Sequence, residues 1–330
     1  MKMRAALERH FNAIWYGSSK PGILLRVLSL AYAAWWAKRL VRPMARPPVP
    51  VIVVGNLTVG GGGKTPLVIA LARHLLDENR QVAVISRGYG GAEPGEPELV
   101  PPDGDPGHFG DEPVLIAQTV RVPVWVCRSR RTALEAAVRS GADVVIADDG
   151  LQHRALPRSF EICAVDGIRG LGNRRMVPAG PLRQPLSRME TVDLVMIKAG
   201  DWQWPGASRY QLEPIGTSRL DGSAEVPFEQ WFGTTVDAVC AIAYPEGFFE
   251  YLEQAGVKLR SRRCFPDHHA FQAADLAGLK GPILVTAKDA VKLVGLKLEL
   301  DIHFVRVAAK VPERALQSVD DHLQEFSHEP

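Results

Sequence analysis

The sequence predicts an α/β fold, in which a mostly parallel sheet carries helices on both of its faces. Three observations predict it. Short β-branched runs alternate with helical stretches from residue 50 onward, the glycine-rich segment GGGGKTP at 60–66 directly follows one such run, and another run ends in Asp148 and Asp149. Alternation of strands and helices is typical of parallel sheets, because crossover helices cover their faces.

The strand pattern is clearest in the first two thirds of the chain. Runs with the length and apolar content of buried strands occupy residues 50–54, 81–86, 122–127, 142–149, 161–166 and 192–198. Between the first two runs, the stretch PLVIALARHLLDENR places Val68, Leu71 and Leu75 on one helical face. These residues predict a core domain over 47–205.

The residue pattern changes near residue 201, where it predicts loops or short strands. Strand patterns resume at 237–243, 281–287 and 302–307, with a helical stretch at 246–256. We therefore place a domain boundary within 205–235 and predict a smaller C-terminal α/β lobe over 206–330, which contributes to the active site.

Residues 1–46 form a basic head, with nine Lys and Arg side chains and one Glu. Its stretch GILLRVLSLAYAAWWAKRLVR is apolar and aromatic, but the run from Val27 to Ala37 is too short for the roughly 20 residues that span a bilayer. We expect an amphipathic helix in a membrane interface, closed by a proline-rich joint at 42–50. The alternative is a helix packed on the protein's own core. We expect no nucleic-acid partner.

Overall composition is that of an ordinary globular protein, with 46% hydrophobic and 23% charged residues. The four cysteines, Cys127, Cys163, Cys240 and Cys264, are scattered without a C-x-x-C pair. This spacing argues against a zinc site or a disulfide framework. We expect all four to be small buried apolar residues.

The glycine-rich segment is interpreted as a phosphate-binding loop. Gly60, Gly61, Gly62 and Gly63 offer unhindered amides between a strand and a helix whose N-terminus attracts anions. Lys64 would hold the β- and γ-phosphates, and Thr65 would bind Mg²⁺. Thr58 occupies the place of the usual first glycine, so a flexible glycine turn is the alternative. The loop's context favours a P-loop NTPase-like sheet.

The acidic pair Asp148 and Asp149 ends a buried strand, where a carboxylate would complete the Mg²⁺ shell. A solvated turn is the alternative. Guanine-binding members of this class usually carry N-K-x-D, and the segments TAKD at 286–289 and IKAGD at 197–201 lack that spacing. We therefore expect ATP as the nucleotide.

A long connection from Gly88 to Gly110 contains seven glycines and five prolines. Connections of that length are usually functional. At its end, Asp111 and Glu112 open a helix, so Asp111 is either a helix cap or a general base. The segment FPDHHAF at 265–271 groups Asp267, His268 and His269.

Several of these stretches together resemble the tetraacyldisaccharide 4'-kinase family, the lipid A 4'-kinases of Gram-negative bacteria. They are GNLTVGGGGKTP, SRGYGG, GDEPVLIA, DDGLQHR, PAGPLRQP, DHHAF and TAKDAVK, in that order along nearly the whole chain. The resemblance implies a P-loop kinase that moves the γ-phosphate of ATP to the 4'-hydroxyl of an acylated glucosamine disaccharide 1-phosphate. It also implies a peripheral enzyme on the cytoplasmic face of the inner membrane.

The resemblance further implies roles for individual residues. Lys64 and Thr65 would bind ATP–Mg²⁺, with Asp148 and Asp149 at the metal. Asp111 would be the catalytic base, assisted by a histidine of the DH motif, His268 or its neighbour His269. Candidates for contacts to phosphate, sugar or the substrate pocket are Arg87, Tyr89, Glu112 and Arg183.

Two positions depart from the family pattern. Gln184 follows Arg183 where the family commonly has Glu, and Leu151 replaces a Phe, a change that we expect to concern packing. A different class of function, a membrane-associated P-loop switch or partitioning ATPase, would fit the loop and the acidic pair equally well. It would not explain the long glycine-rich connection or the DH motif. A soluble sugar or nucleoside kinase would leave the basic head unexplained.

Overall fold

The fold is described from a computed structural model of the chain, over residues 2–38, 46–296 and 298–328. The side chains of residues 2–6, 8 and 9 are also left out of the description. Residues 42–45 of the predicted proline-rich joint, and the basic residues Arg39 and Arg42, therefore lie outside the described residues.

The first part of the chain forms a parallel sheet with its crossover helices. Its strands are β1 (Val51–Gly55), β2 (Val82–Ser86), β3 (Glu98–Leu99), β4 (Val124–Val126), β5 (Val144–Asp148), β6 (Phe160–Asp166) and β7 (Leu194–Lys198). Its helices are α3 (Lys64–Asp77), α4 (Pro106–Phe109), α5 (Asp111–Val120) and α6 (Arg130–Arg139), with a 3₁₀ turn η1 (Leu186–Glu190).

The second part continues the same sheet. Its strands are β8 (Ser208–Arg219), β9 (Glu225–Val226), β10 (Thr235–Cys240), β11 (Lys258–Cys264), β12 (Ile283–Thr286) and β13 (Ile302–Lys310). Its helices are α7 (Pro245–Gln254), α8 (Ala287–Leu293) and α9 (Glu313–His328), with 3₁₀ turns η2 (Phe228–Trp231), η3 (Ala273–Leu276) and η4 (Val294–Leu296).

Across the described part of the chain, the strands run in the order β11–β10–β12–β13–β8–β7–β6–β1–β5–β2–β4–β3, with β9 paired to β8. Most neighbours are parallel. The exceptions are the pairs β3–β4, β8–β9 and β8–β13. Separate hydrophobic clusters cover the two faces of the first part, one including α3, α5 and α9 and the other including α6. The predicted mostly parallel sheet with helices on both faces is confirmed.

Burial explains why the central strands are so apolar. Every residue of β1, VIVVG, is buried, as expected for a strand with helices on both sides. Helix α3 buries Val68, Leu71 and Leu75, as predicted, and carries Pro66 in its first turn. Proline is tolerated there because its position needs no N–H donor. This packing holds the start of α3 at the end of β1.

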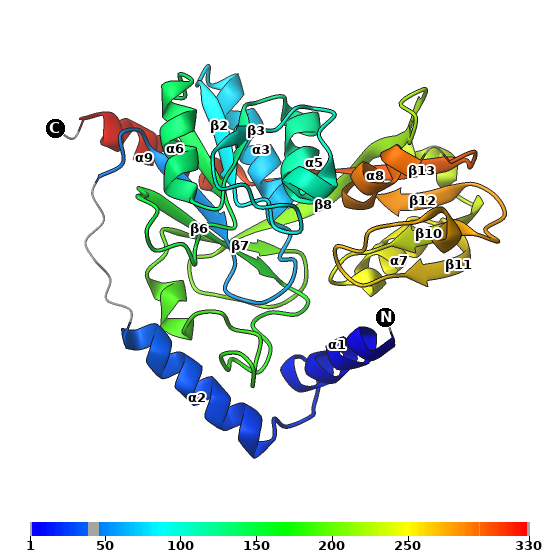
Figure 1. Cartoon of the computed structure of the whole chain (residues 1–330), viewed down its shortest axis with the longest axis horizontal. Helices are drawn as coiled ribbons and strands as arrows, with labels where there is room; N and C mark the ends of the chain where they lie inside the picture. The colour runs from blue at the N-terminus through cyan, green and yellow to red at the C-terminus, as the bar shows by residue number, and fades with distance from the viewer. Residues whose placement is uncertain (1, 39–45, 297, 329–330) are drawn as a thin grey trace.

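Strand β8 links the two parts of the sheet. Its beginning pairs parallel with β7 and its remainder pairs antiparallel with β13. Figure 1 shows β8 crossing from the first part to the smaller C-terminal lobe of β10 to β13, α7 and α8. Helix α9 returns to the first part, where Ala315, Val319 and Leu323 join its core. The predicted division near residue 205 thus falls next to a strand shared by both parts.

The basic head contains two helices, α1 (Lys2–Trp15) and α2 (Ile23–Lys38). Both lie outside the sheet and its covering helices (Figure 1). One side of α2 packs on the body through Tyr32, Ala33 and Trp36. On its other side Ile23, Leu24, Val27, Leu28, Leu30 and Trp35 are exposed. None of the helices described is long and apolar enough to cross a membrane.

The cysteine prediction is correct at three positions and wrong at the fourth. Cys127, Cys163 and Cys240 are buried, whereas Cys264 is exposed. Cys264 ends β11, a strand at the sheet edge in which exposed and half-exposed residues alternate. An edge strand with an open face does not bury each of its side chains.

Candidate active site

The glycine-rich loop connects β1 to α3 and leaves the N-terminus of that helix without a side-chain cap. Gly60 and Gly63 adopt positive φ values of 97° and 77°, which favour glycine. A Cβ on Gly63 would also come within 2.7 Å of both the Lys198 Cδ and the Tyr210 Oη atoms. Glycine is required at this position, and the helix N-terminus is open to an anion.

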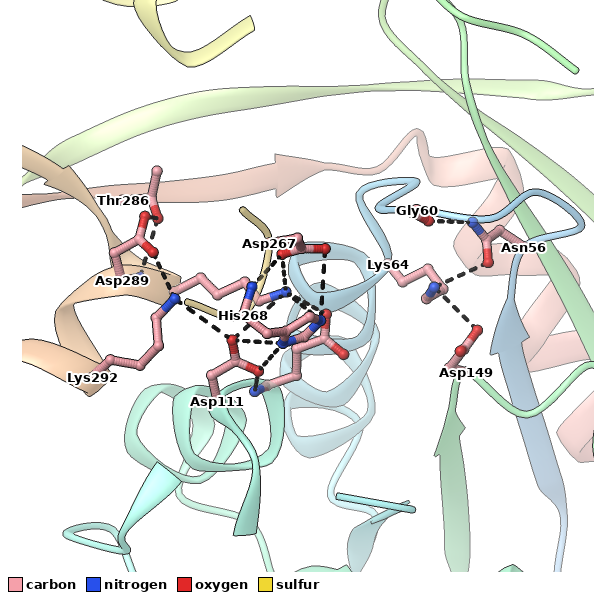
Figure 2. Close-up of polar contacts among 12 residues, drawn as sticks. Asn56, Gly60, Lys64, Asp111, Asp149, Asp267, His268, Thr286, Asp289 and Lys292 are labelled. Carbon is pink, nitrogen blue, oxygen red and sulfur yellow. Dashed lines mark hydrogen bonds and ion pairs between the residues drawn. The ribbon is translucent and has the colours of Figure 1, made fainter. Parts of the chain in front are cut away.

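Lys64, the first residue of α3, is buried at the centre of a polar network (Figure 2). Its Nζ atom lies 3.0 Å from Asn56 Oδ1 and 3.1 Å from Asp149 Oδ1. Arg183 donates to both carboxylate oxygens of Asp149, at 3.0 and 3.1 Å, and to the Asn56 carbonyl oxygen. Burial alone would raise the pKa of Asp149, but Lys64 and Arg183 hold it well below its usual range.

Parallel pairing places the acidic residues next to this loop. Val54 of β1 is in register with Asp148 of β5, so both strands end at the same edge. The Asp148 side chain is fully buried, and neither of its oxygens has a hydrogen-bond partner among the described residues. Burial, with the nearby charge of Glu112, raises the pKa of Asp148 to about 7. Arg130 donates to the carbonyl oxygens of Asp148 and Asp149 and so holds the backbone that carries them.

These oxygens fit a magnesium ion. Mg²⁺ prefers oxygen ligands and is usually bound by one or two carboxylates together with substrate phosphates. The two unpaired oxygens of Asp148 provide such a donor, whereas Asp149 already binds two cations. Thr65 follows Lys64 in the first turn of α3 and is half-buried. The described residues contain no cluster of three or more His, Cys, Asp or Glu that could hold a metal. A site completed by nucleotide phosphates would not need one.

A second cluster joins the first part of the molecule to the C-terminal lobe (Figure 2). Asp111 is buried in the first turn of α5, and His268 lies in the loop after β11. The Nδ1 atom of His268 is 3.1 Å from both carboxylate oxygens of Asp111. Burial would raise the pKa of Asp111, but the hydrogen bond with His268 and the charges of Lys288 and Lys292 lower it overall.

The structure distinguishes between the two neighbouring histidines. His269 pairs with Asp275, its Nε2 atom lying 2.8 Å from Oδ2, and its ring stacks on Phe265. His268 alone of the two contacts Asp111. It has a φ of +61°, and Gly90 of the long connection packs beside its ring.

The remaining predicted residues, apart from Arg87, lie in or beside the two clusters. Arg183 belongs to the Lys64 network, as described. The ring of Tyr89 meets the His268 ring edge-on, with centroids 5.1 Å apart, and Glu112 pairs with Lys288 at 3.2 Å. Arg87 is exposed and pairs with Glu93 of the long connection at 3.0 Å. Thr58 is half-buried, and its backbone forms an antiparallel bridge with Leu182 just before the glycine-rich loop.

The two positions that depart from the family pattern touch each other. Gln184 is buried and donates from Nε2 to the carbonyl oxygen of Leu151, at 3.0 Å. An ionised Glu has no proton to donate to that carbonyl. Leu151 is fully buried, with its side chain against Gly55 at the end of β1. The Gln184 amide therefore stabilises the backbone at Leu151 through this hydrogen bond.

Sequence reasoning missed several residues of the site. Asn56 and Arg130 support the Lys64 network, while Lys288 and Lys292 lie beside Asp111. Asp267 was grouped with His268 in the sequence but was given no role. The signal for Asn56 was its position directly after β1. The two lysines belong to TAKDAVK, one of the segments that resemble the family, but we inferred no role for this segment from the sequence. Together the clusters place the glycine-rich loop, a buried carboxylate without a hydrogen-bond partner and an acid–imidazole pair in one region (Figure 2).

Comparisons with known proteins agree on one family. The model of the family described as tetraacyldisaccharide-1-P 4'-kinase matches residues 22–324. The tetraacyldisaccharide 4'-kinase of Alcanivorax borkumensis is 44% identical over 314 residues, which are 93% of this chain and 95% of that protein. The enzyme of the same name from Halorhodospira halophila is 42% identical over 287 residues, covering 84% of this chain and 86% of its own.

A solved structure has the same fold. The crystal structure of LpxK from Aquifex aeolicus in complex with ATP superposes with a TM-score of 0.74. It is 26% identical in sequence, and the match covers 90% of this chain and 98% of that one.

Proposed function

Because this chain belongs to the tetraacyldisaccharide-1-P 4'-kinase family, we propose that it transfers the γ-phosphate of ATP to the 4'-hydroxyl of a tetraacylated glucosamine disaccharide 1-phosphate, a lipid A precursor. It is a kinase. This proposal rests on one observation: the glycine-rich loop at the start of α3 and the buried Asp111–His268 pair lie in the same site. Phosphorylation of a sugar hydroxyl needs a base close to the bound triphosphate, and this arrangement supplies a base and a loop that would bind the triphosphate.

At the nucleotide, the open N-terminus of α3 and the Lys64 ammonium would bind the β- and γ-phosphates. Lys64 would exchange its contact with Asp149 for the phosphate oxygens. Arg183 would stay with Asp149 and Asn56 and keep the network in place. The ATP-bound relative at TM-score 0.74 supports ATP as the donor.

Asp148 and Thr65 are the proposed magnesium ligands, with Asp149 beside them. The unpaired buried oxygens of Asp148 support this choice. When bound, Mg²⁺ would offset the negative charge of the ATP phosphates during transfer.

Asp111 would accept the proton of the 4'-hydroxyl as that oxygen forms its bond to the γ-phosphorus. The bond from the γ-phosphorus to the β,γ-bridging oxygen breaks, and its electron pair leaves with ADP. The low pKa of Asp111 keeps it ionised and ready to accept this proton at neutral pH. His268 would orient the carboxylate, and Tyr89 and Glu112, which lie beside this pair, would contact the acceptor sugar. Arg87 is a further candidate for a phosphate or sugar contact.

The exposed side of α2 would bind the membrane surface that holds the lipid substrate. Its side chains are apolar although they face solvent, with Ile23 80% and Leu24 71% exposed. Basic residues of the head would add attraction to anionic lipid. We propose a peripheral position on the cytoplasmic face of the inner membrane. Hydrogen bonds from Ser29 to Met176 and from Tyr32 to Arg183 tie this helix to the body, close to the site.

The test is direct. Purified protein, Mg²⁺ and γ-labelled ATP are incubated with acylated disaccharide 1-phosphate in mixed micelles, and the label in the lipid is counted. Label at the 4' position is expected. A membrane-associated switch or partitioning ATPase would instead hydrolyse ATP in response to a protein partner and leave the lipid unlabelled.

A further inference from the structure

Lys288 occupies the centre of the cluster that joins α5 to the C-terminal lobe. It lies in the first turn of α8, and its side chain is 18% exposed. Its Nζ atom lies 3.2 Å from Glu112 Oε1, 3.3 Å from Asp267 Oδ1 and 3.8 Å from Asp111 Oδ2. Burial would lower its pKa, but these three carboxylates raise it. The ammonium therefore stays charged throughout the working pH range.

The same Nζ atom faces the far side of the His268 ring. It lies 3.5 Å from Nε2, while Nδ1 on the other side of the ring is 3.1 Å from Asp111. An ammonium group has three donors and no acceptor, and an ionised carboxylate has acceptors only. A hydrogen bond from Lys288 therefore requires an unprotonated Nε2, and a hydrogen bond to Asp111 requires a proton on Nδ1.

From this geometry we propose that Lys288 is a positioning residue, which holds His268 as the neutral tautomer with its single proton on Nδ1. This inference rests on the proposed function for its consequence in the reaction. In that tautomer His268 donates to Asp111 and cannot take a proton from it at Nδ1. Asp111 is then the group that receives the hydroxyl proton, and His268 fixes the direction of its lone pairs.

Other charged groups around the ring leave this assignment in place. Asp267 Oδ2 lies 3.6 Å from Nε2 and would favour a second proton there. Lys288 contacts the other oxygen of the same carboxylate, at 3.3 Å, and already neutralises it. Lys292, one turn further along α8, pairs with Asp289 at 2.8 Å and lies 4.0 Å from Asp111. Glu112 faces Lys288, and Tyr89 meets the ring by its edge.

The first experiment reads the tautomer directly. The full chain is labelled with ¹⁵N-histidine, and long-range ¹H–¹⁵N correlations are recorded at pH 7.5, with His268→Gln used to assign the signal. We expect a protonated Nδ1 and an unprotonated, downfield Nε2 for His268. A proton on Nε2, in either the other neutral tautomer or the imidazolium, would overturn the proposal without the need for any lysine variant.

The second experiment removes the cation. In Lys288→Met we expect His268 to gain a proton on Nε2, which changes its ¹⁵N signals, and the pH profile of kcat/KM to differ from that of the wild type. Lys288→Arg, which keeps a charged donor, should retain the wild-type tautomer and profile. Lys292→Met removes the neighbouring cation and should leave the His268 spectrum unchanged.

Kinetics separate this inference from the proposed function. For Lys288→Met we expect kcat to fall about 10- to 100-fold with the KM for ATP within about twofold, as for loss of a group that orients a general base. An unchanged spectrum and pH profile in a folded Lys288→Met protein would refute the role of Lys288. Absence of lipid phosphorylation by the wild type would refute the proposed function and leave the spectroscopic result standing.

Discussion

Lys64 and Asp149 form an ion pair of 3.1 Å between the first residue of α3 and the turn after β5. The lysine that would bind phosphate is thus held in the site by a carboxylate that Arg183 also binds. The Asp149 carboxylate thus compensates the charge of the buried Lys64 ammonium, and the more highly charged phosphates of a nucleotide would take its place. Nucleotide binding would replace one oxygen partner of Lys64 with others, with little movement of the side chain.

Replacing this lysine tests the nucleotide site. In Lys64→Met we expect ATP to bind about 10- to 100-fold more weakly, because hydrogen bonds to charged groups contribute about 1.5–3 kcal/mol each. Transfer should fall by a further factor of about 10²–10³. Isothermal titration calorimetry and the lipid-labelling assay measure the two effects. Lys258→Met, on an exposed edge strand, is the matched control. Unchanged ATP affinity in Lys64→Met would contradict the nucleotide site.

Asp148 provides the test of the metal site. Asp148→Asn keeps the shape of the side chain but removes a charged oxygen ligand. We expect the Mg²⁺ concentration for half-maximal activity to rise at least about tenfold, and chelation of Mg²⁺ to stop transfer by the wild type. Asp143→Asn, just before the opposite end of β5, serves as the control. The same Mg²⁺ requirement in Asp148→Asn and wild type would assign the metal to other residues.

Asp111 is tested by separating binding from turnover. Asp111→Asn cannot accept a proton, so kcat should fall by about 10²–10⁴-fold, while ATP affinity stays within about twofold. Because the pKa of Asp111 is lowered from 3.8, the wild type should show no acid limb from this carboxyl between pH 5 and 8. Stopped assays across that range, with calorimetry for ATP, provide both measurements. Equal losses in binding and turnover would reject Asp111 as the base.

Local sequence signals predicted the parts of the molecule that local chemistry determines. The loop with Lys64 could be recognised because it connects a fully buried strand to a helix, and the acidic pair because it ends another buried strand; parallel strands bring these ends together. The full length of strand β8 could not be recognised, because its sequence SRYQLEPIGTSR is largely polar and contains both Pro and Gly. Its extended state depends on pairing with β13, almost a hundred residues later.

Contacts between distant segments account for the rest of the site. Lys288 meets Glu112 across 176 positions of sequence, and the contact exists only because α8 packs beside α5. The choice of His268 over His269 likewise depends on which ring faces α5. Helix α9 carries an apolar stripe of Ala315, Val319 and Leu323, but the surface that it covers lies in the first part of the chain. Spacing alone does not identify that partner.

The exposed side of α2 predicts how the protein partitions onto vesicles. In the triple variant Ile23→Gln, Leu24→Gln and Leu30→Gln, three side chains at least 71% exposed lose their apolar surface. Burying one such side chain contributes on the order of 1 kcal/mol or more, so binding to anionic vesicles should weaken on the order of 100-fold. Sedimentation with liposomes measures it. Ile215→Gln, exposed on β8, should bind as wild type. Unchanged partitioning of the triple variant would reject this surface.

The C-terminal lobe has a buried carboxylate whose effect on stability depends on pH. Asp237 of β10 accepts hydrogen bonds from Ser261 at 2.6 Å, from the Lys280 backbone at 2.8 Å and from Arg260 at 3.1 Å. Burial would raise its pKa, but these three donors lower it from 3.8. A lowered pKa in the folded state means that the ionised form stabilises the fold above about pH 4. This contribution is lost as pH falls through the folded-state value.

Asp237→Asn should therefore lower the free energy of unfolding by about 1–3 kcal/mol at pH 7, because a buried network loses its charge. The difference from wild type should persist at pH 5 and begin to shrink below pH 3.8, where the unfolded chain takes up a proton at this carboxyl, and it should vanish only below the lower pKa of the folded state. Urea unfolding followed by circular dichroism at pH 7, 5 and 3.5 measures it, with Glu299→Gln on the surface as the control. A difference that grows toward low pH would show that the three donors do not favour the ionised carboxylate.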